Sequence, residues 1–302
     1  MNIKLTNNVG FCWGVRRALD LAIKSSSSSR KMYTYGPLIH NKDVVQMLKT
    51  RGIEPLPSIT MRSSKENALV IRAHGIPPLV RDKLALKGFK IIDATCPHVM
   101  KSQKMVQQYA DKGYQIIIAG DKKHAEVVSL VGYARVSRYH SRAIVISSPQ
   151  EVAKLINSKP RLSKKKTYPT WHPVRRVCIL AQSTFQPQLY EEIVDTLRLG
   201  FPKENELIVL NTICHAPARR QREVKELAKK VGAFVVVGDH KSANTTNLAL
   251  LVRSLKIPAF QVASVSELPL RALKKYYSIG ITTGTSTPDS VLQTVIDKIA
   301  QL

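Results

Sequence analysis

The chain has 302 residues, of which 44% are hydrophobic and 23% charged, a composition typical of globular rather than disordered proteins. Its 47 Lys and Arg exceed its 21 Asp and Glu by 26, an excess that usually indicates acidic or phosphate-bearing partners, nucleic acid above all. The basic residues are scattered and aromatic residues make up only 6%. We therefore expect most of this charge on a solvated surface, and nucleic acid is not the expected partner.

The sequence also indicates a cellular compartment. No apolar stretch approaches the ~18 residues that a membrane helix needs, and the N-terminal segment lacks a signal-peptide pattern. Four cysteines in 302 residues make a poor disulfide framework. The prediction is a protein of the reducing cytoplasm, without a membrane partner, whose thiols are available for metal binding or reaction.

The first predicted elements are a β-like run at 3–9, Cys12 and a helical segment. A second apolar strand ends at Gly36, and His40 stands four residues further on. After another helix, the segment ALVIRAHGIPP predicts a strand that ends near His74. A helix that begins with proline follows, because the missing N–H of proline costs nothing in a first turn.

The same order of elements recurs twice. In the second repeat a strand at 89–94 precedes Cys96, a strand ends at Gly120, and a later strand ends near Ser183, before Pro187. In the third repeat a strand at 206–210 precedes the cysteine. Each of these three cysteines stands 24 residues before a glycine, and the fourth, Cys178, does not. The third set comprises Cys214, Gly238, Ser242 and, before the last proline, Ser286.

Alternating strands and helices favour parallel sheets covered by helices. The predicted fold is α/β, with three small domains related by pseudo-threefold symmetry. Parallel units carry functional groups at the carboxyl ends of their strands, so the cysteines and the polar residues of the three repeats are expected to face one central site. The expected domains are 13–95, 96–212 with an exposed basic loop at 158–176, and 213–302, the last completed by the N-terminal strand 1–12.

Three converging cysteines indicate a metal site. A structural zinc site usually takes four ligands in local pairs such as C-x₂-C, and the chain has no such pair. Thiolates are the usual ligands of iron–sulfur clusters, and three of them would leave one iron open for substrate. The spacing favours a cluster, while a three-cysteine zinc site and three structural thiols stay open. Cys178 lies in the apolar run 177–180 and is interpreted as a small buried hydrophobic residue.

The polar residues of the repeats indicate an anionic ligand. Imidazoles, hydroxyls, an amide and helix N-termini together suit a diphosphate. Glu126 is one of few acids near a predicted strand end, and it is either a carboxylate in the first turn of a helix or a functional acid. The candidate ligand-binding residues are His40, His74, His124, Ser183, Thr184, Ser242, Asn244 and Ser286.

Nine ordered segments resemble one known family, the 4-hydroxy-3-methylbut-2-enyl diphosphate reductases (the IspH/LytB type), and they include all three repeat cysteines. The resemblance runs from Gly10 to Asp289. The segments are GFCWGV (10–15), IHN (39–41), AHG (73–75), DATCP (93–97), HAEV (124–127), AQSTF (181–185), NTICHA (211–216), SANTTN (242–247) and TGTSTPD (283–289).

The resemblance implies a trefoil of three α/β domains around one [4Fe–4S] cluster per subunit. Cys12, Cys96 and Cys214 would bind this cluster, and one iron would have no cysteine ligand. The implied reaction is the last step of the non-mevalonate (MEP) isoprenoid route. Two electrons and two protons remove the hydroxyl of (E)-4-hydroxy-3-methylbut-2-enyl diphosphate as water, which yields isopentenyl and dimethylallyl diphosphates. A ferredoxin- or flavodoxin-type protein would donate the electrons.

Individual roles follow by resemblance. Glu126 matches the carboxylate that delivers a proton, directly or through neighbouring hydroxyls, and Ser183 and His124 complete the expected catalytic group. Two other function classes stay open on the residues alone: a basic nucleic-acid-associated protein on the same scaffold, and a three-cysteine zinc hydrolase. The presence of all three cysteines together with Glu126 favours the reductase. The family's diphosphate-binding positions match His40, His74, His124, Ser242, Asn244 and Ser286.

Overall fold

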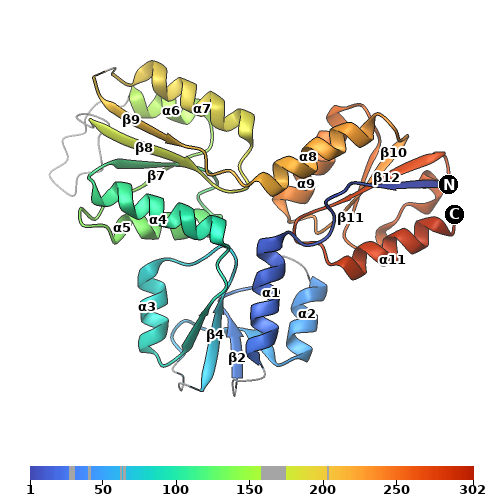
Figure 1. Cartoon of the computed structure of the whole chain (residues 1–302), viewed down its shortest axis with the longest axis horizontal. Helices are drawn as coiled ribbons and strands as arrows, with labels where there is room; N and C mark the ends of the chain where they lie inside the picture. The colour runs from blue at the N-terminus through green and yellow to red at the C-terminus, as the bar shows by residue number, and fades with distance from the viewer. Residues whose placement is uncertain (27–30, 40–41, 62, 64–65, 158–174, 203) are drawn as a thin grey trace. The chain divides into compact units, whose positions relative to one another are not determined.

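The computed structural model describes residues 1–26, 31–39, 42–61, 63, 66–157, 175–202 and 204–302 (Figure 1). His40 and most of the predicted loop at 158–176 lie outside the described residues. No helix of the described residues combines the length and the apolar character that crossing a bilayer requires.

The structure separates into two compact units. The first unit comprises Met1–Ser58, Glu66–Ala73 and Cys214–Leu302, and the second comprises Ile59–Lys65 and His74–Ile213.

Strands and helices alternate along the described chain, as the sequence predicts, except that the strands at 53–55 and 67–71 follow one another with no described helix between them. The strands are β1 (Asn2–Leu5), β2 (Lys31–Thr34), β3 (Ile53–Pro55), β4 (Asn67–Ile71), β5 (Lys90–Asp93), β6 (Gln115–Ala119), β7 (Ile144–Ile146), β8 (Arg176–Ala181), β9 (Glu206–Leu210), β10 (Ala233–Val237), β11 (Ala259–Val262) and β12 (Ser278–Thr283). The helices are α1 (Trp13–Ser26), α2 (Lys42–Thr50), α3 (Pro78–Leu86), α4 (Pro97–Asp111), α5 (Ala125–Arg135), α6 (Pro149–Ile156), α7 (Pro187–Gly200), α8 (His215–Ala228), α9 (Ala243–Ser254), α10 (Leu270–Leu273) and α11 (Asp289–Ala300), with a 3₁₀ turn, η1 (Val265–Glu267).

The described strands form three four-stranded sheets, made of β2–β5, of β6–β9 and of β10–β12 with β1. The pairs with a described register are parallel, so the predicted α/β fold with parallel sheets is confirmed. The strand that runs into a repeat glycine lies between the next two strands in every sheet: β2 between β3 and β4, β6 between β7 and β8, and β10 between β11 and β12. The threefold repeat of the sequence is therefore a repeat of strand order.

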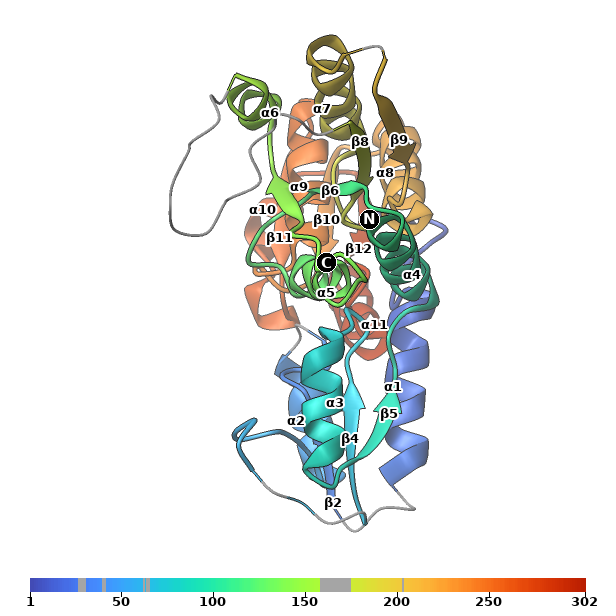
Figure 2. The ribbon, with the colours of Figure 1, turned by 90° about the vertical axis from the view of Figure 1, so that its left-hand side faces the viewer.

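The second sheet lies between two pairs of helices. Its central strand β6 has a continuous run of fully buried residues at 116–119, which is typical of a parallel strand covered on both faces. Residues of α6 and α7 pack with Ile117 and Ile179 on one face, and residues of α4 and α5 pack with Ile116 and Ile118 on the other. Figures 1 and 2 show these two helix pairs on opposite sides of the sheet.

The third sheet has the same layers. Val235 and Val237 of β10 pack with α10 and α11, whereas Phe234 and Val236 pack with α8 and α9, as expected because successive side chains of a strand alternate between faces. The N-terminal strand β1 pairs with β12 in parallel, from Asn2 opposite Ser278 onward. The domain boundaries expected from the sequence stay a prediction.

Candidate functional site

The three repeat cysteines occupy equivalent positions at the beginning of helices. Cys96 is the N-cap of α4 and Cys214 is the N-cap of α8. Cys12 precedes α1, and its carbonyl oxygen accepts a hydrogen bond from the backbone N–H of Arg16 at 3.0 Å. All three thiols are partly exposed. Helix N-termini favour negative charge, so each position suits a metal-binding thiolate.

Cys178 differs from these three cysteines in its position in the fold and in its burial. It lies within β8 and is completely buried, as the sequence predicts. Burial raises the pKa of its thiol to about 12, which leaves it protonated at neutral pH. Cys178 is therefore a core residue, and the metal-binding candidates are the three cysteines at helix N-termini.

The candidate metal ligands are divided between the two units. Cys12 and Cys214 belong to the first unit and Cys96 belongs to the second. Within its described residues, neither unit alone holds three His, Cys, Asp or Glu side chains placed to bind a metal ion. The donor chemistry of the three thiols fits an iron–sulfur cluster. Their joint binding of a cluster stays a prediction.

Glu126 is the central acid of the second unit. Because β6 and β8 are adjacent and parallel, with Ala119 opposite Ala181, the loops that follow them lie at the same edge of the sheet. Glu126, in the first turn of α5, is fully buried there. Ser183 donates two hydrogen bonds to its carboxyl group, from the backbone N–H to Oε1 at 2.8 Å and from Oγ to Oε2 at 2.6 Å.

The pKa of Glu126 is set by its burial and by these hydrogen bonds, which act in opposite directions. Burial raises the pKa of the carboxyl group to about 6, although the two hydrogen bonds from Ser183 oppose this shift. A carboxyl group with this pKa is substantially protonated in slightly acid solution. Ser183 therefore holds an acid that can release a proton close to neutral pH, which is the property that a general acid needs.

Two histidines lie beside this acid. His124 is the N-cap of α5, and its Nδ1 atom accepts a hydrogen bond from the backbone N–H of Glu126 at 3.2 Å. When the ring is neutral, Nε2 must therefore carry the proton and can donate it to a ligand. The ring of His74 packs edge-on against that of His124, with centroids 5.1 Å apart. The structure thus brings His74, His124, Glu126 and Ser183 together in the second unit.

Neutral donors gather at the equivalent edge of the third sheet. Ser242 is the N-cap of α9, and its Oγ atom accepts a hydrogen bond from the backbone N–H of Thr245. Asn244 is 6% exposed, and the Nδ2 atom of its side chain has no hydrogen-bond partner among the described residues. A buried amide that lacks a partner is rare in folded proteins and calls for a ligand. At a helix N-terminus that ligand is expected to be an anion.

The loop that carries Ser286 lies beside this group. It follows β12, which pairs with β10. The backbone N–H of Gly284 and the hydroxyl of Thr287 both donate to the carbonyl oxygen of Val237, each at 2.9 Å. A Cβ atom on Gly238 would lie only 2.6 Å from Oγ1 of Thr245. The repeat glycine therefore allows the end of β10 to lie close to the first turn of α9.

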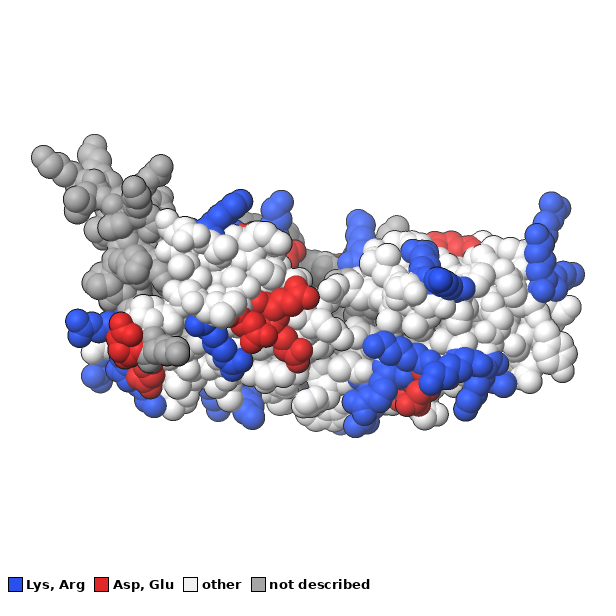
Figure 3. Space-filling model, turned by 90° about the horizontal axis from the view of Figure 1, so that it is seen from above, with Lys and Arg blue, Asp and Glu red and all other residues white. Residues whose placement is uncertain are grey.

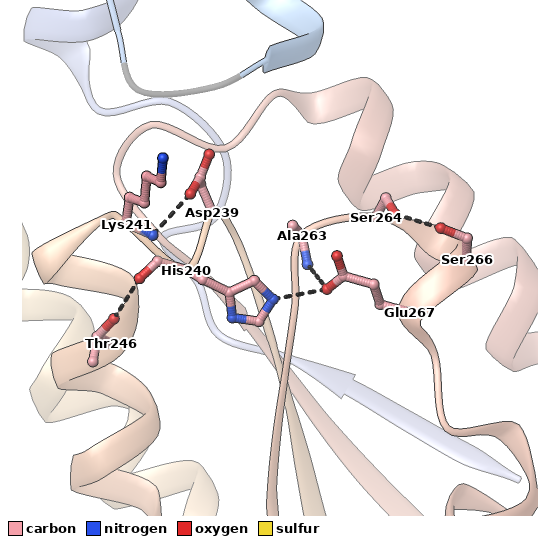
Figure 4. A network of polar contacts seen from close by, with 8 residues as sticks. All are labelled: Asp239, His240, Lys241, Thr246, Ala263, Ser264, Ser266 and Glu267. Atoms are coloured by element: carbon pink, nitrogen blue, oxygen red, sulfur yellow. Dashed lines mark hydrogen bonds and ion pairs between the residues drawn. The ribbon is translucent and has the colours of Figure 1, made fainter.

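A polar network that the sequence analysis missed supports the loop before Ser242 (Figure 4). Nε2 of His240 lies 2.9 Å from Oε2 of Glu267. The same carboxylate oxygen accepts a hydrogen bond from the backbone N–H of Ala263 at 2.8 Å, and the hydroxyl of Thr246 donates to the carbonyl oxygen of His240 at 3.2 Å. These contacts connect the loop to the segment between β11 and η1 and to α9.

Arg220 is a further residue of the site that was not predicted from the sequence. It is 3% exposed, and its guanidinium donates to the carbonyl oxygens of Thr283, Gly284 and Gly10 at 2.8 to 3.0 Å. Burial lowers the pKa of this guanidinium, and the negative charge of a Cys12 thiolate opposes that effect. Arg220 is therefore a buried cation that favours the thiolate of Cys12. Its neighbour Arg219 is exposed, and nothing in the sequence distinguishes the two.

Comparison with known proteins decides the family. The family model described as LytB protein matches residues 3–300, almost the whole chain. The chain belongs to the LytB family. The identification made from the nine sequence segments is confirmed.

Members of the LytB family with assigned activities align along their full lengths. A 4-hydroxy-3-methylbut-2-enyl diphosphate reductase of Clostridioides difficile is 36% identical over 307 residues, which cover 100% of both chains. The enzyme of the same name from Aquifex aeolicus is 32% identical over 303 residues, which cover 100% of this chain and 97% of the relative.

Solved structures agree with the family assignment. One is described as (E)-4-hydroxy-3-methyl-but-2-enyl diphosphate reductase, the terminal enzyme of the non-mevalonate pathway; it is 32% identical, covers 100% of both chains and superposes with a TM-score of 0.73. The E-1-hydroxy-2-methyl-but-2-enyl-4-diphosphate reductase of Plasmodium falciparum is 27% identical, with 98% of this chain and 87% of that chain covered and a TM-score of 0.82. The LytB fold predicted from the sequence is therefore confirmed.

Proposed function

We propose that the protein reduces (E)-4-hydroxy-3-methylbut-2-enyl diphosphate, the activity for which its full-length relatives are named. It acts at the terminal step of the non-mevalonate pathway, as predicted from the sequence. The observation in the structure that carries this function is the buried Glu126 carboxyl group, which accepts two hydrogen bonds from Ser183. It lies in a helix turn that is capped by His124, whose ring packs against that of His74. A nucleic-acid-associated protein or a zinc hydrolase on this scaffold has no comparable support.

The reaction breaks one carbon–oxygen bond. The substrate takes up two electrons and two protons and loses its hydroxyl group as water, and the remaining allylic fragment becomes isopentenyl or dimethylallyl diphosphate. The chain must therefore bind the diphosphate, supply a proton to the departing hydroxyl and receive electrons one at a time. Each task has its own set of residues.

Cys12, Cys96 and Cys214 are the proposed ligands of the electron-transfer group. They are the partly exposed thiols at helix N-termini, and the buried Arg220 adds positive charge next to Cys12. Their thiolate chemistry fits one [4Fe–4S] cluster per chain with one iron not ligated by cysteine. When bound, this cluster supplies the electrons and a Lewis-acidic iron for the substrate hydroxyl.

Glu126 is the proposed proton donor. Its raised pKa, about 6, means that the carboxyl group holds a proton in an appreciable fraction of molecules near neutral pH. The Ser183 hydroxyl, 2.6 Å from Oε2, is placed to pass a proton from the carboxyl group to the leaving hydroxyl. Because Glu126 is fully buried, bulk water does not compete for this proton.

The proposed diphosphate site combines neutral and ionisable donors. Asn244 offers a buried amide without a partner among the described residues, Ser242 caps α9, and Nε2 of His124 faces away from its helix N-terminus. These groups and helix N-termini suit an anion with several oxygen acceptors. The complete proposed set is His40, His74, His124, Ser242, Asn244 and Ser286, of which His40 lies outside the described residues.

A product assay tests the proposed function. The protein is purified without air, supplied with dithionite-reduced methyl viologen and incubated with (E)-4-hydroxy-3-methylbut-2-enyl diphosphate. We expect viologen oxidation, with isopentenyl and dimethylallyl diphosphates formed in an amount equal to half of the electrons consumed. Absence of both products from an iron-loaded preparation would contradict the proposal. A ferredoxin- or flavodoxin-type protein is the proposed physiological donor.

A further inference from the structure

A surface hollow in the first unit lies next to two of the proposed cluster ligands. Its walls come from the N-terminal ends of α1 and α8 and include Cys12, Trp13, His215 and Arg219. These two helices begin directly after Cys12 and Cys214, respectively. An approaching molecule that occupies this hollow therefore contacts residues adjacent to both cysteines.

The exposed face of α8 carries a basic stripe that begins at this hollow. Arg219, Arg222, Lys225 and Lys229 are all exposed, and their spacing of three to four residues places them along one side of the helix. Glu226 is the one exposed acid within this stretch of α8. Figure 3 shows basic side chains gathered with few acidic ones among them at the lower right of the view.

The basic residues of this stripe form no salt bridge within the described part of the chain. Arg219, Arg222 and Lys225 take part in none of its salt bridges, in contrast to Arg16, which pairs with Asp289 at 2.8 Å. The nearby acid Glu223 accepts a hydrogen bond from the backbone N–H of Asn8 at 2.9 Å. The stripe therefore presents a net positive charge to solvent.

An apolar side chain adjoins the stripe. Trp13, the first residue of α1, is 66% exposed and lines the same hollow. Exposing a large indole to water is unfavourable, and tryptophan and arginine are the side chains most often found at the energetic centre of protein interfaces. An apolar centre beside charged residues is the usual composition of a protein-binding surface.

We propose that Trp13, Arg219, Arg222 and Lys225 form the docking surface for an acidic electron-donor protein. This inference rests on the proposed function, because electrons are needed here only if Cys12 and Cys214 hold the redox group. Two successive dockings supply the two electrons of one turnover, and each donor molecule is oxidised by one electron. We call this set of residues the donor surface.

Charge and position both favour this occupant over a nucleic acid. The basic stripe steers an acidic protein toward the hollow and accelerates encounter, and the short path to Cys12 and Cys214 favours electron transfer, which weakens steeply with distance. Surfaces that bind single-stranded nucleic acid usually present several stacked aromatic side chains along a basic groove. The donor surface offers a single exposed indole beside one basic helix.

The test uses an acidic plant-type [2Fe–2S] ferredoxin as the probe and the cluster-loaded full chain. Its variant is the double substitution Arg219→Glu/Arg222→Glu, and the matched control is Lys274→Glu/Lys275→Glu. Lys274 and Lys275 are exposed and precede β12, so they lie at the opposite edge of the third sheet from Cys12. Each double substitution changes the net charge by the same amount, so general electrostatic effects are matched.

Calorimetry then measures the dissociation constant of ferredoxin at low and at physiological salt. We expect about tenfold weaker binding or more for Arg219→Glu/Arg222→Glu, no change for the control, and loss of most of the difference at high salt. Trp13→Ala should weaken binding about tenfold at both salt concentrations, because it removes apolar contact. The ratio of ferredoxin-driven to viologen-driven turnover should fall in parallel with binding.

The outcomes separate this inference from the proposed function. Equal ferredoxin affinity for wild type and Arg219→Glu/Arg222→Glu, or equal loss in the control, would overturn the donor surface. So would tight binding of a mixed-sequence RNA with a steep salt dependence, if the same double substitution abolished it and ferredoxin did not bind. Failure of the proposed function would show differently, as absence of viologen-driven turnover in the wild type.

Discussion

The second and third sheets carry corresponding groups at the carboxyl edges of their strands, but the two edges differ in one respect. At the edge of the second sheet the chain satisfies its own buried acid, because both carboxyl oxygens of Glu126 accept hydrogen bonds from Ser183. At the edge of the third sheet the chain leaves a buried donor, Nδ2 of Asn244, without a partner among the described residues. The buried polar group of the second sheet thus has its hydrogen-bond partners within the chain, whereas that of the third sheet has none among the described residues.

The two sheet edges suit different tasks in the reaction. A buried group that the chain already satisfies is rigid and has a defined proton affinity before substrate arrives, which suits a proton donor. A buried group without a partner gains most when a ligand brings the missing acceptor, which suits binding. We therefore expect substitutions at the second sheet to change turnover and substitutions at the third to change affinity.

The largest expected effect concerns the cysteines that both units contribute. Replacement of Cys12, Cys96 or Cys214 by serine should remove most of the iron, because each thiolate is a proposed cluster ligand. Cys178→Ser is the control within the same chain and should retain its iron, although the buried serine will lower stability by roughly 1–3 kcal/mol. Iron analysis after anaerobic purification measures the effect, and equal loss in all four variants would refute the ligand assignment.

Glu126→Gln should reduce turnover by about 10²- to 10⁴-fold, the usual contribution of a positioned acid. Glutamine keeps the shape and one carbonyl acceptor for Ser183 but has no carboxyl proton to deliver. The KM for substrate and the iron content should change little, because Glu126 is proposed neither to hold the diphosphate nor to bind the cluster. Turnover within a few-fold of wild type, with iron retained, would show that another group delivers the proton.

Asn244→Ala should produce the opposite pattern. It removes a proposed hydrogen bond to a charged ligand, which is worth about 1.5–3 kcal/mol, so substrate affinity should fall by roughly 10- to 100-fold while turnover at saturation changes little. Titration of the iron-loaded variant with substrate gives the affinity, and saturation kinetics give turnover. A fall in turnover at unchanged affinity would remove the proposed contrast between the two sheets.

The pH dependence of turnover should follow Glu126. Burial raises the pKa of its carboxyl group from the usual 4.5 to about 6, and the protonated form is the one that donates. Turnover at saturation should therefore be constant below pH about 6 and fall above it, approaching tenfold per pH unit. The residual activity of Glu126→Gln should lack this descending limb, so an identical limb in the variant would assign it to another group.

The smallest expected effect concerns the support of the Ser242 loop. His240 pairs with Glu267 at 2.9 Å, but both side chains are substantially exposed, and exposed pairs contribute only about 0.2–1 kcal/mol. His240→Ala should raise KM by about two- to fivefold without changing turnover. His240→Gln keeps a nitrogen donor for Glu267 and should restore the wild-type KM. An unchanged KM in His240→Ala, or a KM raised equally in both variants, would show that this hydrogen bond does not influence substrate binding.

Much of the fold could be predicted from the sequence because the repeat is encoded in local signals. The 24-residue spacing between cysteine and glycine, the apolar strands and the prolines after them indicate each element directly. The structure confirms the strand at Glu206–Leu210. The strands before Cys12 and Cys96 are shorter than predicted, because pairing and burial, rather than the apolar run alone, define a strand's ends.

The long-range contacts of the site were beyond the sequence. Glu126 and Ser183 are separated by 57 positions and meet only because β6 and β8 are neighbours. The burial of Arg220 depends on three carbonyl oxygens supplied by Gly10, Thr283 and Gly284. Such contacts depend on the order of the strands in the sheets, and no local sequence pattern predicts them.

The proposed cluster is tested by the metal and sulfide content of the protein purified without air, together with its Mössbauer spectrum with and without substrate. We predict about four iron and about four sulfide per chain, with one iron whose signal changes when the allylic diphosphate is added and three that do not. Zinc in place of iron and sulfide would contradict the assignment of Cys12, Cys96 and Cys214 as the ligands of a cluster with one open iron. So would four equivalent irons whose Mössbauer signals do not change when the substrate is added.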